Sequence, residues 1–464
     1  MKIAVLYDYP FRVNVKREGI GVFTRFLLNS IMANYSDVEI EFWCYDFNRE
    51  NVKSSFQDIF EKYPNRVTIF DNFSNWDYVP NALVQLCKYY QLIAFNIIDF
   101  IDRIKFKIKK KDKYIHKRKF VQEKIKKLKD KNFHRIIGKE NYNDVLQQTL
   151  IKNVKKYSKA NVVFSIFVNL ELGRFFNCPK FVQVHDLFTL PLFDLFKDDI
   201  ENLADENKQV LNNLGEYALK GATFISSSMY VAQNHSLKYI PHITNNQISV
   251  IPFPPLIKDF NQSELLNKED FKAKYNIASV YIVYPSQNRP NKNWIVILKA
   301  IKALRDEGME LQFVTTGRID DVKITKEYVD KNNLRNLICE VGNLSEDELY
   351  ALYKYADLQI SSTIMEGMGI SGQALEALKV GNIPVIHAKS LGIEDSLKSV
   401  GLNLETADLN WFDIDDDKKL VYLIKDVLSN KQLHINKQKH VLEAYQKRTW
   451  DDVAKEYYKL FCIK

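Results

Sequence analysis

Two glutamates flank a glycine-rich segment in the C-terminal part of the sequence. The segment reads Glu366-Gly-Met-Gly-Ile-Ser-Gly-Gln-Ala-Leu-Glu376 and follows a predicted strand that ends at Ser361. Its glycines allow a tight turn close to a ligand, and the helix predicted to begin near Gly372 presents free N–H groups to an anion. That geometry suits a diphosphate, with the two carboxylates accepting hydrogen bonds from sugar and ribose hydroxyls. The alternative is a glycine-rich connection between two solvated glutamates.

Three other clusters could take part in chemistry. His185-Asp186 follows a predicted strand, although a strand-end histidine held by local hydrogen bonds is a common alternative. Gly19-Ile-Gly21 is either a plain helix entry or a ligand loop. Asp413-Ile-Asp-Asp-Asp417 resembles a metal site but precedes a predicted helix, so helix capping is favoured. We therefore expect no metal.

The elements that position these residues alternate between strands and helices. The predicted strands are Lys2–Tyr7, Val38–Trp43, Val67–Ile69, Val162–Ile166, Phe181–Val184, Thr223–Ile225, Ile248–Pro252, Val280–Tyr284, Leu311–Thr315, Leu337–Val341, Leu358–Ser361 and Ile383–Ile386. The later helices are predicted at Trp294–Asp306, Ser345–Tyr355, Gln373–Leu378 and about Lys418–Leu428. Such alternation predicts an α/β protein with parallel sheets, in which ligands bind outside the carboxyl ends of the strands.

A proline cluster, Pro252-Phe-Pro-Pro255, interrupts this pattern before it starts again. We place a domain boundary there, which gives an N-terminal Rossmann-like domain at 1–255 and a second Rossmann-like domain from 256 onward. Two doubly wound domains should face a cleft between them.

The positive charge is concentrated in one segment. The net charge is +8, yet residues 103–135 contain 16 Lys or Arg and three acids, a local charge of +13 that leaves −5 elsewhere. An apolar helical face at 93–108 adjoins the lysines, so we predict a basic helical insertion at about 85–140 that could bind an anionic membrane surface through 92–135. The alternative is a solvated helical hairpin packed on the N-terminal domain. Nucleic-acid binding is not expected, because no recognition motif accompanies the charge.

Composition excludes several classes of protein. The five cysteines are scattered and never spaced Cys-x-x-Cys, which argues against a disulfide framework and a zinc site. No apolar stretch is long enough to span a bilayer, and Asp8 falls where a secretory signal would still be apolar. We expect a cytoplasmic protein that could attach peripherally to the inner face of the plasma membrane.

Several segments in order resemble one family. Tyr284-Pro-Ser-Gln-Asn-Arg-Pro-Asn-Lys-Asn-Trp, Gly342-Asn-Leu-Ser-Glu-Asp-Glu-Leu, the Glu366 to Glu376 segment, Val184-His-Asp-Leu and Gly19-Ile-Gly are similar to motifs of the "glycosyl transferases group 1" family. These are retaining GT-B glycosyltransferases (glycosyltransferase family 4). The final Trp450-Asp-Asp-Val resembles the family's closing helix, so the resemblance implies domains at 1–255 and 256–440, with 441–464 crossing back to the first.

The resemblance also implies residue roles. Lys292 would bind the diphosphate with help from Arg289, Glu376 would bind the ribose, Glu366 the transferred sugar, and His185 that sugar from the other domain. The catalytic set is then Glu366, His185 and Lys292. Donor-binding residues would further include Arg289, Glu376, Gly367, Met368, Gly369, Ile370, Gly19 and Gly21.

The sequence departs from the family pattern at two places. The family spaces its two glutamates eight residues apart, whereas Glu366 and Glu376 are ten apart, which we interpret as two extra residues in the 369–373 turn. The family's phosphate-binding arginine lies five residues before the lysine, where this chain has Gln287. Arg289 is therefore a substitute for it rather than an equivalent.

The implied activity is a retaining hexosyl transfer from a nucleotide-diphosphate sugar to a glycan or lipid-linked acceptor, in surface polysaccharide or glycolipid assembly. The co-substrate would be UDP- or GDP-linked and no cofactor is expected. Fixed cations and a helix N-terminus can neutralise a diphosphate leaving group without metal. The alternatives are a nucleotide-sugar epimerase of the same fold and a non-catalytic basic protein that binds membranes or nucleic acid.

Overall fold

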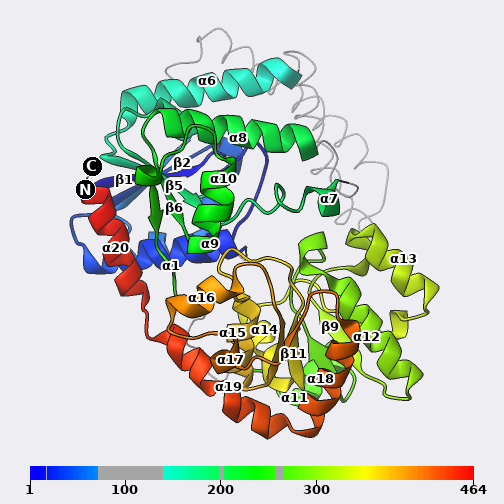
Figure 1. The fold of residues 1–464 in the computed structure, drawn as a ribbon. Coiled ribbons are helices and arrows are strands. Elements are labelled where there is room, and N and C mark those ends of the chain that lie inside the picture. The colour runs from blue at the N-terminus through cyan, green and yellow to red at the C-terminus, as the bar shows by residue number, and fades with distance from the viewer. Residues whose placement is uncertain (17, 72–138, 169, 198–202, 257–264, 464) are drawn as a thin grey trace, which may run out of the picture. The chain divides into compact units, whose positions relative to one another are not determined.

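The computed structural model describes residues 1–464 with the exception of 17, 72–138, 169, 198–202, 257–264 and 464. The described strands form two parallel sheets with helices around them (Figure 1). Nearly all of the predicted basic insertion, including the surface at 92–135, lies outside the described residues. In the part of the chain that is described, no helix is long and apolar enough to cross a membrane.

The first sheet has seven strands in the order β3-β2-β1-β4-β5-β6-β7. Its strands are β1 (Lys2–Tyr7), β2 (Glu39–Cys44), β3 (Val67–Phe70), β4 (Val162–Ser165), β5 (Lys180–Val184), β6 (Thr223–Ser226) and β7 (Ile248–Val250). The helices of this part are α1 (Gly19–Asn34), α2 (Arg49–Ser55), α3 (Gln57–Lys62), α6 (Lys139–Tyr157), α7 (Phe193–Phe196), α8 (Leu203–Leu219), α9 (Met229–Val231) and α10 (Leu237–Tyr239). Chain order reverses between β1 and β4, as in a Rossmann-like sheet.

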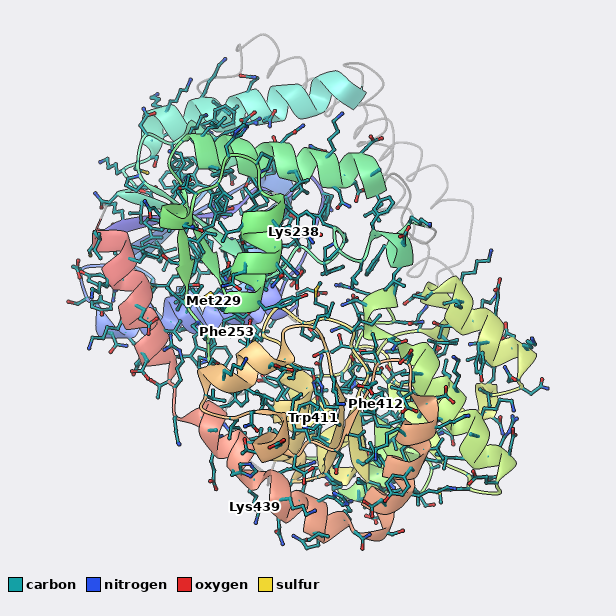
Figure 2. All side chains as sticks on the ribbon, in the orientation of Figure 1. Met229, Lys238, Phe253, Trp411, Phe412 and Lys439 are labelled. Atoms are coloured by element: carbon teal, nitrogen blue, oxygen red, sulfur yellow. The ribbon has the colours of Figure 1, made fainter. Side chains whose placement is uncertain are left out.

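The second sheet has six strands in the order β10-β9-β8-β11-β12-β13. They are β8 (Tyr281–Val283), β9 (Gln312–Thr315), β10 (Ile338–Glu340), β11 (Leu358–Ser361), β12 (Val385–Ala388) and β13 (Trp411–Phe412), the last marked by its two labelled aromatic residues in Figure 2. The order again reverses, between β8 and β11, which pair in parallel. In open sheets of this kind, that reversal point is where ligands bind.

Helices bury both faces of the second sheet. Tyr281 and Val283 of β8 belong to one core cluster and Ile282 belongs to the other, as alternation along a strand requires. The first cluster is closed by α11 (Lys268–Tyr275), α14 (Glu346–Tyr355), α15 (Gly372–Glu376), α16 (Ile393–Ser399), α17 (Leu404–Ala407) and α19 (Lys431–Gln446). The second is closed by α12 (Trp294–Asp306), α13 (Lys323–Lys331) and α18 (Asp417–Ser429). The predicted α/β class with two doubly wound sheets is confirmed.

Local details differ from the expectations at a few points. Helix α1 already begins at Gly19, and α13 was not expected because Thr325 and Val329 are its only buried residues. The helix expected at Gln373–Leu378 is divided into α15 and a π-helix at Ala377–Gly381. Asp416 caps α18 through Lys419 N, in agreement with the expected capping role of the acidic run. The chain closes with α20 (Trp450–Cys462), and the proposed domain limits stay a prediction.

Candidate active site

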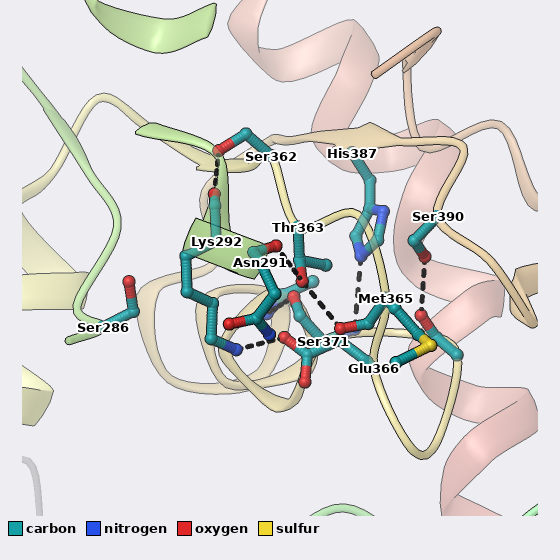
Figure 3. A network of polar contacts seen from close by, with 12 residues as sticks. Ser286, Asn291, Lys292, Ser362, Thr363, Met365, Glu366, Ser371, His387 and Ser390 are labelled. Atoms are coloured by element: carbon teal, nitrogen blue, oxygen red, sulfur yellow. Dashed lines mark hydrogen bonds and ion pairs between the residues drawn. The ribbon is translucent and has the colours of Figure 1, made fainter. Parts of the chain in front are cut away.

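Two loops at the reversal point of the second sheet bring together the most distinctive residues of the sequence. Lys292 ends a 3-10 turn, Pro290–Lys292, after β8, and Glu366 follows β11. The Lys292 Nζ forms an ion pair with the Glu366 Oε1 (Figure 3). Their side chains are only 14% and 20% exposed, so the pair is largely withdrawn from water. Two residues 74 positions apart thus form the centre of the site.

Polar groups after β11 hold the backbone at Lys292. The Ile364 N–H donates to the Asn291 carbonyl oxygen at 2.8 Å, and the Ser362 hydroxyl donates to the Lys292 carbonyl oxygen at 2.7 Å. The Thr363 hydroxyl lies 3.2 Å from the same Asn291 oxygen (Figure 3). Sequence reasoning did not single out these residues. Their signal was weak, because a serine or threonine at the end of a strand has many ordinary uses.

Electrostatics favour a charged lysine at this position. Burial opposes the charge of Lys292, but attraction to the Glu366 carboxylate, the hydrogen bond to it and the Tyr284 hydroxyl together outweigh burial, so the pKa of Lys292 is raised. Burial raises the pKa of the Tyr284 hydroxyl to about 12, against the opposing effect of Lys292. The site can therefore offer a fixed cation to an anionic group.

The turn after Glu366 has little freedom. Gly369 has φ +79°, and a Cβ there would lie 2.5 Å from the Gly392 carbonyl oxygen. Its N–H donates to the Glu366 carbonyl oxygen at 3.0 Å, and the Ser390 hydroxyl donates to the Gly369 carbonyl oxygen at 2.9 Å. The backbone amide of Gly369, which we predicted to be a donor-binding residue, is thus already hydrogen-bonded within the turn. Ile370 is 1% exposed, so its side chain belongs to the core.

Glu376 ends α15 and is held from a neighbouring helix. Ser371 caps the start of α15 through Ala374 N, and the Tyr353 hydroxyl of α14 donates to the Glu376 Oε2 at 2.6 Å. Burial raises the pKa of Glu376 to about 7, although the Tyr353 hydrogen bond acts in the opposite direction. Its carboxyl group therefore changes charge near neutral pH.

The loop before Lys292 contains the predicted substitute arginine. Arg289 is exposed, and its guanidinium donates a hydrogen bond to the side chain of Gln287. Gln287, which stands at the position of the family's arginine, is therefore in contact with Arg289, the predicted substitute for that arginine. Gly317, after β9, packs tightly behind this loop, because a Cβ would lie 2.6 Å from both the Ser286 carbonyl oxygen and the Asn288 nitrogen.

His185 lies at the end of β5, beside Gly367. A Cβ on Gly367 would lie 2.1 Å from the His185 carbonyl oxygen, and the hydroxyls of Ser227 and Ser228 donate to the Gly367 carbonyl oxygen at 2.9 Å. Burial lowers the pKa of His185 to about 4, so the ring is neutral. Burial, with repulsion from Glu366, raises the pKa of the adjacent Asp186 to about 6.

The two N-terminal glycines have different surroundings. Gly21 packs against the preceding loop, where a Cβ would lie 1.9 Å from the Val15 carbonyl oxygen. Gly19 opens α1, and a Cβ there would meet no heavy atom within 4 Å. Close packing within the N-terminal segment therefore accounts for the glycine at 21, and the donor-binding role of both glycines stays a prediction.

A lysine, a glutamate and a glycine turn thus meet at the reversal point of the second sheet. A comparison with protein families matches the same part of the chain. Residues 267–448 match the family model "Glycosyl transferases group 1". The matched segment contains Lys292, Glu366 and Glu376, and it supports a glycosyl transfer function. No curated protein matched the chain.

The chain also resembles solved structures of other proteins over nearly its whole length. The chain resembles Anabaena HepE, crystallised with UDP and glucose, with a TM-score of 0.60 and 12% identity over 100% of both chains. It also resembles a sucrose-phosphate synthase from Thermosynechococcus elongatus, with a TM-score of 0.58 and 14% identity over 100% of both chains. S. aureus TarM gives a TM-score of 0.56 at 10% identity over 99% of both chains. These likenesses confirm the GT-B fold with two Rossmann-like domains.

Proposed function

We propose that the protein is a retaining glycosyltransferase of glycosyltransferase family 4 that moves a hexosyl unit from a UDP- or GDP-linked sugar to a glycan or lipid-linked acceptor. The observation that carries the proposal is the Lys292–Glu366 pair at the reversal point of the second sheet. The family match over 267–448 supports it. UDP in the HepE and TarM structures supports a nucleotide-sugar donor.

In this proposal, Lys292 neutralises the negative charge that develops on the diphosphate as the bond between the anomeric carbon of the sugar and the phosphate oxygen breaks. A fixed cation in a site shielded from water stabilises such charge without reorganisation. Arg289 assists from the loop surface, Glu366 accepts hydrogen bonds from the sugar, and Glu376 accepts them from the ribose. His185, in its neutral form, contacts the sugar. The acceptor hydroxyl attacks the anomeric carbon from the face that the leaving group occupies and passes its proton to the departing phosphate oxygen, which preserves the anomeric configuration and needs no enzyme nucleophile.

The first test identifies the donor and the product. UDP- and GDP-sugars are screened by thermal shift, because a ligand that binds the folded state raises its melting temperature. The best donor is then incubated with candidate acceptors, and products are analysed by mass spectrometry for a new glycosidic bond and by NMR for its anomeric configuration. Activity that survives EDTA would support metal independence.

Variants separate this proposal from its alternatives. Lys292→Ala should lower kcat/KM by about a hundredfold, as expected when a charge-stabilising group is lost. Lys299→Ala, which removes an exposed lysine from α12, is the matched control. A product that is an epimerised nucleotide sugar would favour the epimerase. Donor binding and turnover that are unchanged in Lys292→Ala would refute the role of this site, and failure of every nucleotide sugar to bind would favour a non-catalytic protein.

The location of the protein is part of the same proposal. We propose a cytoplasmic protein, peripheral to the inner membrane face through 92–135, where a lipid-linked acceptor in polysaccharide or glycolipid assembly would be found. The high positive charge of 103–135 supports this. Liposome flotation of the full chain and of a variant lacking 103–135 tests it, because unchanged flotation of the variant would exclude that segment as the anchor.

A further inference from the structure

A buried histidine outside every motif of the sequence contacts the turn between the two site glutamates. His387 lies on β12 and is fully buried. Its Nε2 is 3.2 Å from the Ser371 backbone nitrogen, and its Nδ1 is 2.6 Å from the Ala388 carbonyl oxygen (Figure 3). Its ring packs edge-to-face with that of Trp411 of β13, with the ring centroids 5.6 Å apart.

These two contacts define the state of the ring. A backbone N–H can only donate, so the Nε2 that faces Ser371 must carry no proton. A carbonyl oxygen can only accept, so Nδ1 must carry the proton. Burial lowers the pKa of His387 to about 4, and of the charged groups that act on it, Glu366 raises this pKa and Lys292 lowers it. The ring is therefore neutral, in one tautomer, with both nitrogens hydrogen-bonded.

The contact with Ser371 falls where the glutamate spacing is two residues longer than in the family. Ser371 is the N-cap of α15 and is itself fully buried. Ser390, shortly after β12, holds Gly369, and Leu391 N donates to the Ile364 carbonyl oxygen at 2.8 Å. His387 is the part of this support that reaches the far end of the turn, next to the helix that carries Glu376.

We propose that His387 is a positioning residue for the donor: its imidazole holds the Ser371 amide and so fixes the longer turn between the sugar-binding and ribose-binding glutamates. The inference rests on the proposed function, because the turn can position a donor only if the protein binds a nucleotide sugar. A leucine in this place would keep most of the volume but leave the buried Ser371 N–H without an acceptor, which is costly in a protein interior. A glutamine could return an acceptor oxygen near the position of Nε2.

The test compares His387→Leu, His387→Gln and His434→Leu. His434 is the matched control, because it is also buried but its Nε2 faces Asp426 Oδ2 at 3.2 Å, away from the turn. The donor is UDP-glucose or GDP-mannose, whichever binds the wild-type protein more tightly. For His387→Leu we expect a donor KM raised about tenfold, by analogy with the lower end of the effect seen when a group that orients a metal ligand is removed. The kcat should change much less, and His387→Gln should recover most of the loss.

A second measurement follows the turn without any donor. Backbone hydrogen exchange of the 366–376 peptide should be faster in His387→Leu than in the wild type and near normal in His387→Gln and His434→Leu. Unchanged exchange in His387→Leu, or a KM effect equal to that of His434→Leu, would overturn the proposal. If the wild type binds neither nucleotide sugar, the proposed function fails and the donor part of this inference fails with it. The exchange result still decides whether His387 holds the turn.

Discussion

The Lys292–Glu366 pair leads to a counterintuitive prediction: Glu366→Gln should bind a free nucleoside diphosphate more tightly than the wild type does. A diphosphate that binds Lys292 must compete with the Glu366 carboxylate, which also repels it. Glutamine keeps the shape of the side chain but removes its charge. The intact donor gains less from the change, because its sugar hydroxyls lose a charged acceptor, and such charge-assisted hydrogen bonds are about twice as strong as neutral ones.

The size of the effect follows from the burial of the pair. An exposed ion pair contributes about 0–1 kcal/mol, whereas removal of one partner from a fully buried pair costs about 3–5 kcal/mol. Because Lys292 and Glu366 are 14% and 20% exposed, their competition with phosphate should fall between these limits, at about 1–2 kcal/mol. That corresponds to a five- to thirtyfold gain, roughly, in affinity for UDP or GDP.

Isothermal titration at fixed ionic strength measures both ligands on each protein. The ratio of the dissociation constant for the nucleoside diphosphate to that for its sugar conjugate should fall in Glu366→Gln, by less than the five- to thirtyfold, roughly, that the nucleotide alone gains, because the donor gains as well. Glu348→Gln is the matched control, because Glu348 also pairs with a lysine, Lys274 at 2.5 Å, but joins α14 to α11 outside the site. Equal or weaker nucleotide binding by Glu366→Gln would refute the competition.

Three further predictions concern Glu376 and Gly317. Because the pKa of Glu376 is raised to about 7, the carboxylate that we propose binds the ribose forms as the pH rises from 6 to 8, so the donor KM should fall over that range and be flat in Glu376→Gln. Because the pKa of this carboxyl is higher in the folded than in the unfolded protein, folding favours its protonated form. The free energy of unfolding of the wild type, relative to that of Glu376→Gln, should therefore fall as the pH rises from about 4.5 to about 7, and urea unfolding at both ends of this range measures the difference. Gly317→Ala should lower the free energy of unfolding by about 1–3 kcal/mol and raise the donor KM, because its Cβ would displace Ser286 or Asn288; a variant with unchanged melting temperature and KM would contradict this.

The sequence predicted the strands well because buried parallel strands are short apolar runs between turns. The resemblance to family motifs, rather than the strand pattern, implied that Lys292 and Glu366 belong to one site, and the structure shows that the strands before them, β8 and β11, are neighbours. His387 and Tyr353 could not be found in this way. Each is remote in sequence from the group it holds, Ser371 or Glu376, and each sits in an ordinary apolar strand or helix. Only the packing of β12 and α14 against the turn reveals them.

The position of Glu376 relative to Glu366 depends on the residues that follow Glu376 as well as on the ten-residue spacing between the two glutamates. The helix that carries Glu376 continues into a π-helix at Ala377–Gly381, and a Cβ on Gly381 would lie 2.7 Å from the carbonyl oxygen of Tyr353, the residue that binds Glu376. Because each residue of an α-helix turns the chain by about 100°, loss of one residue from this π-helix would rotate Glu376 relative to the part of the chain that follows, while the number of residues between Glu366 and Glu376 stayed the same. A single deletion in the π-helix would therefore change the direction of the Glu376 side chain, and with it the proposed contact to the ribose, while leaving Glu366 and its proposed contact to the sugar in place.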